Sequence, residues 1–377
     1  MIVAEIAFWV CVALLVYAQA GYGLLLAALA GVRARPARAA APDPPPDVSL
    51  IVAAYLEAEG IAAKVANLRA LDWPAERVEV IVSTDGSTDG TPARAREAGA
   101  DLVLENPRGG KVRAQDAAVA RARGEIVAFS DANSTWEPGA LRELVAPFAD
   151  PQVGYVCGQV RFVDSGGTNQ EGVYWRYETW LRERESRLAS VTAGNGAIYA
   201  TRREAYFEVD PIMGHDLSFP FNMVKRGWRA VYAPRARAVE KMVPSIEGEF
   251  ARKRRMMSHT WPIVLRGGML SPRGYGPLYA LMVASHRVLR YATPFLHALA
   301  LALNLALAAA GAGPLYVVTL AAQLALPAAA VLARFVPARP LLVARYYVLT
   351  TASLAAGLWD WLRHGTPAGW EPAEGTR

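Results

Sequence analysis

The chain has 377 residues, of which 53% are hydrophobic, and a formal net charge of +6. This length accommodates one soluble domain plus membrane segments, and the apolar residues concentrate at the two ends of the chain. No single face gathers base-stacking aromatic residues with the positive charge, so no nucleic acid partner is expected. An anionic membrane surface accounts for much of the arginine excess. The two cysteines, Cys11 and Cys157, form neither a disulfide framework nor a zinc-ligand pattern.

The N-terminal segment, residues 1–31, is predicted to be a membrane anchor. Residues 6–30 form a nearly uncharged run that is long enough to cross a bilayer. A cleaved signal peptide is the alternative, because residues 18–20 resemble a cleavage site. However, no basic residue precedes the run, and the apolar stretch continues past that point. Arginines follow in the Pro/Ala linker, residues 32–46, so the positive-inside rule places the next domain in the cytoplasm and the N-terminus outside.

Residues 47–273 are predicted to form a soluble α/β domain. In its first half, short apolar runs that indicate buried strands alternate with helix-like segments. The expected strands are residues 48–54, 78–82, 101–104 and 126–129, and the expected helices include residues 57–71 and 111–122. Such alternation is typical of a mainly parallel sheet with right-handed crossovers, in which ligands bind at the carboxyl ends of the strands.

The second half of the domain has a less regular order. The expected elements are strands at residues 153–160, 197–200 and 230–233 and helices at residues 170–188 and 217–226. Residues 192–196 are expected to form a loop that contains Asn195 between two glycines. A basic amphipathic helix, residues 246–265, is predicted near the end of the domain.

The C-terminal end is apolar again. Residues 274–290 combine aromatic and basic side chains, which favours a helix at the membrane interface. Membrane segments are expected at residues 291–311, 315–333 and 341–362 of a C-terminal region that covers residues 291–362. The third segment either spans the membrane or is re-entrant, and residues 363–377 are a tail. The prediction is a multi-pass protein of the cell (inner) membrane with a cytoplasmic domain. The spans lack the buried charges and inverted repeat of a transporter.

One strand of the domain runs directly into an acidic tip. Residues 126–129 are apolar, and Asp131 and Asn133 follow them two residues apart. A carboxylate at the carboxyl end of a strand is placed where open α/β sheets bind ligands. Carboxylate and amide oxygens suit Mg²⁺ or Mn²⁺ that accompanies a phosphate-bearing substrate. The alternative is a simple Asx turn that closes the strand.

Short motifs follow one another along the domain. They are VAAYLE (residues 52–57), DGSTDGT (85–91), GK with QD (110–116), DAN (131–133), GHDL (214–217) and RKRRM (252–256). In this order they resemble the PAYNE, DGSTDGT, GK, DxD, ED and QxxRW motifs of membrane-bound family 2 glycosyltransferases, which include cellulose, hyaluronan and chitooligosaccharide synthases. The resemblance covers residues 48–261 and the arrangement of membrane segments, and it implies a GT-A fold.

The resemblance also implies roles for individual residues. Asp216 is the expected general base of an inverting transfer, and Asp131 with Asn133 is the expected metal site for Mg²⁺ or Mn²⁺. The donor, a nucleotide-sugar with UDP as the expected nucleotide, is assigned Tyr55, Glu57, Asp85, Lys111, Asp131, Arg252 and Arg255. The acceptor is assigned Trp175, Glu178, Asn195, His215 and Trp261. In the basic run, Arg255 is expected to face the site and some of its neighbours to face lipid.

The motifs depart from the family pattern at several positions. Leu56 replaces Asn, Thr84 replaces an acid, Asn133 replaces the second acid of DxD, His215 replaces an acid, and Arg252 and Met256 replace Gln and Trp. Asn133 is expected to weaken metal affinity, and the loss of Gln and Trp argues against processive synthesis by a monomer. Asp216 is expected to have a low pKa because it opens a helix.

The sequence leaves the acceptor open. The leading hypothesis is a lipid-linked sugar or growing glycan, bound at the cytoplasmic membrane face in contact with membrane lipids. One alternative is transfer to a polyisoprenyl phosphate. A second alternative is a catalytically degenerate, membrane-anchored sensor of nucleotide-sugars, which the replacements at Thr84, Asn133 and His215 would fit. A polymer product is expected only from an oligomer, since so few spans barely enclose a channel.

Overall fold

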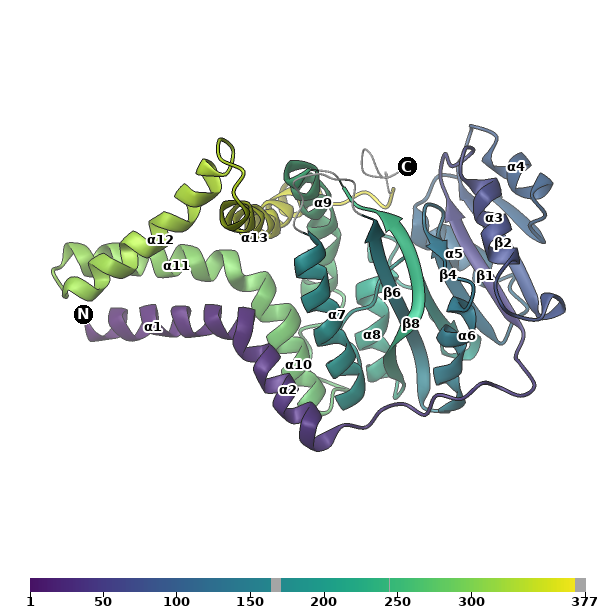
Figure 1. The fold of residues 1–377 in the computed structure, drawn as a ribbon, viewed down its shortest axis with the longest axis horizontal. Helices are drawn as coiled ribbons and strands as arrows, with labels where there is room; N and C mark the ends of the chain where they lie inside the picture. The colour runs from purple at the N-terminus through teal and green to yellow at the C-terminus, as the bar shows by residue number, and fades with distance from the viewer. Residues whose placement is uncertain (164–170, 244, 370–377) are drawn as a thin grey trace.

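A computed structural model describes residues 1–163, 171–243 and 245–369 of the chain. Residue 170, the expected start of one helix, and residues 370–377 of the expected tail lie outside the described residues. An α/β domain forms one side of the molecule and a group of long helices forms the other (Figure 1). The chain enters the domain from the helices and returns to them, as the sequence predicts.

The domain is built on one mixed sheet with the strand order β3-β2-β1-β4-β7-β6-β8-β5. The strands are β1 (Val48–Ala54), β2 (Val78–Asp85), β3 (Leu102–Asn106), β4 (Ile126–Asp131), β5 (Thr135–Trp136), β6 (Val153–Val163), β7 (Ile198–Arg202) and β8 (Arg229–Lys241). Four of the seven pairings between these described strands are parallel. Because only β7 and β5 are antiparallel to their neighbours, the carboxyl ends of the other strands lie at one edge of the sheet.

Helices cover both faces of the sheet because successive side chains of a buried strand point to opposite faces. Leu50 and Val52 of β1 pack in one cluster with α3 (Ile61–Arg69), α4 (Thr91–Glu97) and α6 (Ala140–Val145). Ile51 packs on the other face with α5 (Lys111–Val119) and α8 (His215–Lys225). Short 3-10 turns connect the elements at Ala75–Arg77, Ala146–Ala149 and Arg203–Ala205. The fold is therefore α/β, as predicted, with the sheet as the middle of three layers.

Several element boundaries differ from the expected ones. Helix α3 begins at Ile61 and not at residue 57, because the N–H groups of Glu57 and Ala58 are bound by Thr91 Oγ1 and Asp89 Oδ2, both at 2.9 Å. Strand β8 is 13 residues long, whereas only residues 230–233 were expected. The strand continues past Pro234, which lies where the register between β6 and β8 shifts, so the missing N–H breaks no regular ladder.

Two long helices join the domain to the membrane side. Helix α7 (Glu171–Leu188) packs against the sheet and against the second half of the N-terminal helix. Helix α9 (Ile246–Leu265) has the predicted bounds, and Ser245 caps it by accepting a hydrogen bond from the Gly248 N–H.

Four helices are long and apolar enough to cross a membrane in the described part of the chain, namely Ile2–Arg33, Pro277–Ala309, Pro314–Leu332 and Arg339–His364. The first consists of α1 (Ile2–Val16), a π-turn η1 (Tyr17–Gly21) and α2 (Tyr22–Arg33). The second consists of α10 (Pro277–Val283), a π-turn η5 (Ala284–Val288) and α11 (Leu289–Ala309). The region expected to be a separate interfacial helix, residues 274–290, is thus largely continuous with α11.

The two composite helices are bent at their π-turns. Each has more than 30 residues, which corresponds to about 50 Å of helix, whereas the apolar core of a bilayer is about 30 Å thick. The π-turns lie side by side, with the Tyr17 hydroxyl 2.9 Å from Ser285 Oγ. In Figure 1, α1 and α11 run together away from the domain, while α2 and α10 bend towards it. Only the outer part of each helix is therefore needed to cross the membrane.

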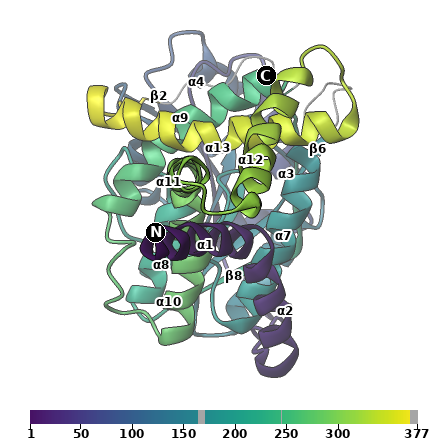
Figure 2. The same ribbon diagram turned by 90° about the vertical axis from the view of Figure 1, so that its left-hand side faces the viewer.

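The last helix, α13 (Arg339–His364), lies across α11, seen end-on in Figure 1 and lengthwise in Figure 2. It packs closely on α9, since a Cβ at Gly357 would lie 2.4 Å from the Met257 Cβ. Arg254 and Asp360 form an ion pair at 2.6 Å, and Trp261 Nε1 donates to the Leu354 carbonyl at 2.9 Å. Helix α12 (Pro314–Leu332) connects α11 to α13. The α9–α13 contact fixes the membrane helices against the domain.

Candidate active site

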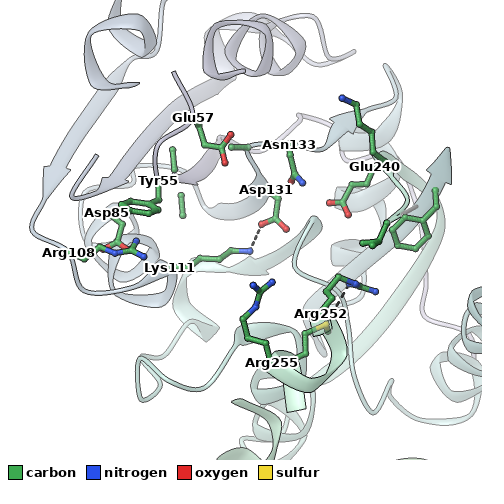
Figure 3. Close-up of a pocket in the computed structure, with 17 residues that line it drawn as sticks. Tyr55, Glu57, Asp85, Arg108, Lys111, Asp131, Asn133, Glu240, Arg252 and Arg255 are labelled. Atoms are coloured by element: carbon green, nitrogen blue, oxygen red, sulfur yellow. Dashed lines mark hydrogen bonds and ion pairs between the residues drawn. The ribbon is translucent and has the colours of Figure 1, made fainter. Parts of the chain in front are cut away.

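A cavity of about 170 Å³ lies at the carboxyl ends of the strands. Every residue predicted to bind the donor lines it, as does Asn133 (Figure 3). These residues are Tyr55, Glu57, Asp85, Lys111, Asp131, Arg252 and Arg255. They come from the ends of β1, β2 and β4, from the start of α5 and from α9. Segments nearly 200 residues apart in the chain therefore form one site, which is called the donor cavity below.

The DGSTDGT motif shapes the loop that follows β1. Ser87 Oγ accepts the Leu56 N–H at 3.0 Å, while Thr91 and Asp89 accept the next two N–H groups of that loop. Asp89 Oδ1 also binds the Thr91 side chain at 2.5 Å. These bonds hold Leu56 at a φ of 54°, which is uncommon for a side chain of this type. The motif thus positions Tyr55 and Glu57 at the mouth of the cavity.

Asp85 holds a second loop of the donor cavity. Its Oδ1 accepts the N–H groups of Gly109 and Gly110 at 2.6 and 2.9 Å, and its Oδ2 pairs with Arg108 at 2.5 Å. The Arg108 guanidinium in turn lies 3.4 Å from the centre of the Tyr55 ring. Asp85 therefore orders the loop before α5, together with an aromatic and cationic surface, Tyr55 and Arg108, on which a planar base can stack.

Acidic and basic side chains meet at the centre of the cavity. Lys111 is ion-paired with Asp131, and Glu240 of β8 lies on the other side of Asp131 (Figure 3). Burial and the nearby Asp131 raise the pKa of Glu240 to about 7. Burial also lowers the pKa of Lys64, whose ammonium donates to the Ser134 carbonyl at 2.7 Å, to about 7. The site is thus a buried cluster in which each charge depends on its neighbours.

Sequence reasoning missed Glu240 and Arg108. Glu240 was not identified because β8 was expected to end at residue 233, which left Glu240 in an unassigned loop. The alternation of Ala236 and Ala238 with Arg235 and Arg237 was a usable signal of a continuing strand. Arg108 stands three residues before Lys111, but neither charge nor spacing indicates that it stacks on Tyr55.

A larger cavity of about 530 Å³ adjoins the donor cavity. Both cavities are lined by Lys111, Asp131, Phe162, Glu240, Arg252 and Met256. From this shared wall the larger cavity extends past Asp216 and His215 to residues of η1, α9, α11 and α13. It therefore connects the carboxyl ends of the strands with the membrane side of the molecule, and it is called the acceptor cavity below.

Asp216 lies in the first turn of α8, at the wall of the acceptor cavity. Its carbonyl accepts the Gly194 N–H at 2.7 Å, which ties α8 to the loop before β7. The expectation of a low pKa is wrong, because desolvation by burial outweighs both the Lys111 charge and the helix N–H groups and raises the pKa of Asp216. A carboxyl with a raised pKa is a stronger base once ionised.

His215 is buried beside Asp216 and lines the same cavity. Its Nδ1 lies 2.8 Å from the Tyr199 hydroxyl, and its ring stacks on Phe219 with centroids 4.1 Å apart. Gln115 donates to the same Tyr199 hydroxyl at 3.2 Å, which favours donation by that hydroxyl to Nδ1 and the tautomer that carries its proton on Nε2. Burial lowers the pKa of His215 to about 3, so the imidazole is neutral at physiological pH.

The residues predicted to bind acceptor divide into two groups. Trp175, Glu178 and Asn195 line the acceptor cavity together with His215. Asn195 is held rigidly, since its amide donates to the Gly158 carbonyl at 2.6 Å and accepts the Ile198 N–H at 2.9 Å. Trp261 is a correction: it lines neither cavity as the described residues define them, because its ring packs on Tyr291 and Phe295 of α11 and its Nε1 donates to the Leu354 carbonyl of α13.

The basic residues of α9, residues 252–255, point in different directions. Arg252 and Arg255 line the donor cavity. Arg254 points away and pairs with Asp360 of α13. Buried Glu249 holds both Arg252 and Lys253 at 2.8 Å, and these cations hold the pKa of Glu249 down to about 2. The basic run is therefore divided between the donor cavity and α13, whereas the sequence predicted a division between the site and lipid.

The oxygen atoms around Asp131 fit a divalent cation. Asp131, Asn133 and Glu240 all line the donor cavity, and Glu240 Oε1 is buried without a hydrogen-bond partner among the described residues. Two carboxylates and an amide oxygen are ligands that Mg²⁺ and Mn²⁺ prefer. No group of three His, Cys, Asp or Glu side chains suited to a metal occurs in the described residues, so a cation bound here would need the Asn133 amide oxygen beside the two carboxylates.

Comparison with known proteins agrees with this geometry. Residues 49–209 match the family model "Glycosyl transferase family 2". The N-acetylglucosaminyltransferase of Rhizobium meliloti (strain 1021) is 30% identical over 244 residues, 58% of this chain and 57% of that protein. The beta-monoglucosyldiacylglycerol synthase of Synechocystis is 35% identical over 167 residues, 41% of this chain and 35% of that protein. The chain thus spans less than two thirds of these curated relatives.

A solved structure matches over nearly the whole chain. It is the mannosyltransferase PcManGT from Pyrobaculum calidifontis in complex with GDP-Man and Mn²⁺, with a TM-score of 0.76 and 26% identity. The match covers 96% of this chain and 99% of that one, so it includes the long helices as well as the α/β domain. Residues 49–209 are therefore a glycosyl transferase family 2 domain with a GT-A fold, and the chain carries helices that are long and apolar enough to span a membrane.

Proposed function

We propose that this protein transfers a sugar from a nucleotide-sugar, with UDP as the expected nucleotide, to a lipid-linked or glycan acceptor at the cytoplasmic face of the cell membrane. The observation that carries this proposal is the pair of adjoining cavities, one lined by every predicted donor residue and the other reaching the membrane helices. The transfer inverts the anomeric carbon and depends on a divalent cation.

The donor cavity suits a nucleoside diphosphate. Tyr55 and Arg108 offer a stacking surface for the base, and Asp85 holds this surface and the adjoining glycine loop in place. Lys111, Arg252 and Arg255 supply positive charge next to this surface, where the diphosphate is expected (Figure 3). Lys111 is paired with Asp131 in the structure, so we expect it to exchange this partner for a phosphate when the donor binds.

Asp131, Asn133 and Glu240 would hold the divalent cation beside the diphosphate. When bound, Mg²⁺ or Mn²⁺ supplies electrostatic stabilisation of the leaving nucleoside diphosphate. Arg252 and Arg255 add fixed positive charge to the same end of the site, which leaves the departing phosphates paired with cations and shielded from bulk water.

Asp216 is the proposed base. It faces the acceptor cavity, while Lys111 and Asp131 contribute to both cavities, so the acceptor hydroxyl and the donor sugar meet between them. Asp216 takes the proton of the acceptor hydroxyl while the oxygen attacks the anomeric carbon from the face opposite the leaving diphosphate. A single displacement of this kind gives inversion, and the neutral Nε2–H of His215 beside it can donate a hydrogen bond to the acceptor.

The test uses purified full-length protein in detergent with UDP- and GDP-linked sugars and Mn²⁺. We expect one nucleotide-sugar to raise the melting temperature and to be hydrolysed slowly to nucleoside diphosphate without acceptor. Binding of a nucleotide-sugar without any hydrolysis or transfer would favour the sensor alternative. The absence of binding to every nucleotide-sugar tested would contradict both hypotheses.

A further inference from the structure

Three buried arginines lie at the membrane end of the acceptor cavity. Arg182 comes from α7, Arg287 from the π-turn η5 and Arg290 from the start of α11, and their exposed fractions are 3%, 7% and 8%. All three line the acceptor cavity, and none lines the donor cavity. The transfer chemistry proposed above does not use them, so their charge needs another explanation.

Two buried carboxylates offset only part of this charge. Glu178 is paired with Arg290, and its Oε2 lies 3.8 Å from Arg287 Nη1. Glu185 lies 2.7 Å from His286 Nδ1 and accepts hydrogen bonds from Thr192. Three guanidinium groups therefore face two carboxylates, which leaves an excess of positive charge before His286 is counted.

Arg287 and Arg290 pair with Glu178, whereas Arg182 forms no ion pair with a described carboxylate. Its Nη2 donates to the Gly194 carbonyl at 3.0 Å, and the rings of Trp175 and Tyr232 flank its guanidinium at 5.5 and 5.7 Å. Its Nε and Nη1 are buried and have no hydrogen-bond partner among the described residues. A buried cation with two unused donors is unfavourable unless an anion binds there, and the guanidinium fork matches the oxygens of a phosphoryl group.

We propose that Arg182, Arg287 and Arg290 bind the phosphoryl group of an acceptor that is embedded in the membrane. This assignment rests on the proposed function and names the chemical class of its acceptor. Gly194 connects the two ends of the cavity, since its carbonyl accepts from Arg182 and its N–H donates to the carbonyl of Asp216. The acceptor therefore presents a hydroxyl to the base while its anionic group is held by the arginines.

The walls of the cavity identify the rest of the acceptor. Beside the arginines, side chains of three helices that pack at the membrane side contribute to the lining, namely Ile263 of α9, Tyr291 of α11 and Val343, Tyr347 and Leu354 of α13. A soluble sugar phosphate would leave these apolar and aromatic surfaces uncovered, whereas the hydrocarbon chain of a lipid covers them. The occupant is accordingly a lipid that carries a phosphoryl group next to its sugar-accepting end.

The experiment measures binding to the full chain in nanodiscs of phosphatidylcholine by calorimetry, with dodecyl phosphate, dodecanol and inorganic phosphate as probes. We expect dodecyl phosphate to bind roughly tenfold or more tightly than the other two, since it alone has both the charge and the chain. Arg182→Gln should lower the affinity for dodecyl phosphate roughly tenfold, and Arg182→Lys should lower it less. Arg184→Gln is the matched control on the same helix, because Arg184 stacks on Trp180 outside the cavity.

Three results would overturn the assignment. Equal affinity for dodecyl phosphate and dodecanol would show that the arginines bind no phosphoryl group, and inorganic phosphate binding as tightly as dodecyl phosphate would exclude a lipid. Weaker binding of Mn²⁺ and nucleotide by Arg182→Gln would assign the cluster to the donor. The comparison of probes needs only wild-type protein, so it holds if Arg182→Gln fails to fold. Failure of the proposed function itself would appear separately, as no binding of any nucleotide-sugar.

Discussion

Asp216 faces the acceptor cavity from the first turn of α8, and its role is open to a direct test. Asp216→Asn keeps the shape of the side chain but removes the base. We expect transfer to fall roughly 10²-fold or more, the scale of general base catalysis, with donor affinity unchanged. An ordinary aspartate has a pKa of about 3.9. Because burial raises the pKa of Asp216, wild-type activity should begin to fall at a higher pH than an ordinary aspartate would cause. Near-normal transfer by the variant would place the base elsewhere.

Metal binding can be measured without turnover, from the decrease in the electron paramagnetic resonance signal of free Mn²⁺. We expect Asp131→Ala to abolish Mn²⁺ binding, Asn133→Asp to tighten it, and Glu240→Gln to weaken it roughly tenfold or more, since Glu240 is the proposed further oxygen ligand. Glu57→Gln is the control, a carboxylate of the same cavity that is assigned to the donor and not to the metal. Unchanged Mn²⁺ affinity of Glu240→Gln would remove Glu240 from the metal site.

His215 predicts a pH dependence of stability. Its pKa is about 3 in the folded protein and about 6.5 in an unfolded chain, so only the unfolded state takes up a proton between these values. The contribution of neutral His215 is therefore complete above pH 6.5 and is lost as the pH falls, by about 1.4 kcal/mol per pH unit. His215→Gln should flatten the dependence of the melting temperature on pH between 6.5 and 4. A slope identical to that of wild-type protein would contradict this prediction.

At the level of residues, the sequence predicted those whose chemistry is tied to a strand end or a motif. Asp85, Asp131 and Asp216 follow that rule, and the structure places all three at the site. Glu240 and Arg182 do not follow it, because a lone Glu in a strand and a lone Arg in a helix have many structural uses. Their positions depend on the pairing of β6 with β8 and on the packing of α7, which are long-range contacts that local patterns do not encode.

At the level of elements, the contact between α9 and α13 depends on Gly357. A Cβ there would lie 2.4 Å from the Met257 Cβ and 2.7 Å from the Arg254 carbonyl. Gly357→Leu should therefore separate the helices and weaken Arg252 and Arg255 as donor ligands, since both stand on α9. We expect a lower melting temperature and weaker nucleotide binding. Ala352→Leu, an exposed position of the same helix, is the control and should change neither.

Element types were easier to predict than element ends. The bounds of α9 were correct because Ser245 is a strong cap and the basic amphipathic pattern is unbroken. The length of β8 was predicted wrongly, because Pro234 interrupts the pattern and only the register shift opposite Gly158 explains how the sheet continues. The π-turns could not be predicted from the sequence, since residues 17–21 and 284–288 have the pattern of ordinary helix. The two turns contact each other in the folded protein.

For the whole molecule, the crossing of α13 over α11 predicts its depth in the membrane. If α1, α11 and α12 cross the bilayer, α13 lies along the surface and covers α9 (Figure 2). Spin labels at exposed positions 352 and 359 of α13 should then report similar depths by oxygen and nickel accessibility. Labels at exposed positions 2 and 16 of α1 should report different environments along the helix. A steady change of depth along α13 would show that it crosses the membrane.

Residues of the two bent helices line the acceptor cavity, so the two substrates would reach the site by different kinds of diffusion. The proposed donor would arrive through water in three dimensions, whereas the proposed lipid acceptor would enter beside α11 and α13 by lateral diffusion in two. The rate should then follow the mole fraction of acceptor in the bilayer and not its bulk concentration. Diluting the acceptor with inert phospholipid would slow transfer even though every molecule remains in the tube. The transfer rate would therefore depend on the lipid composition of the membrane.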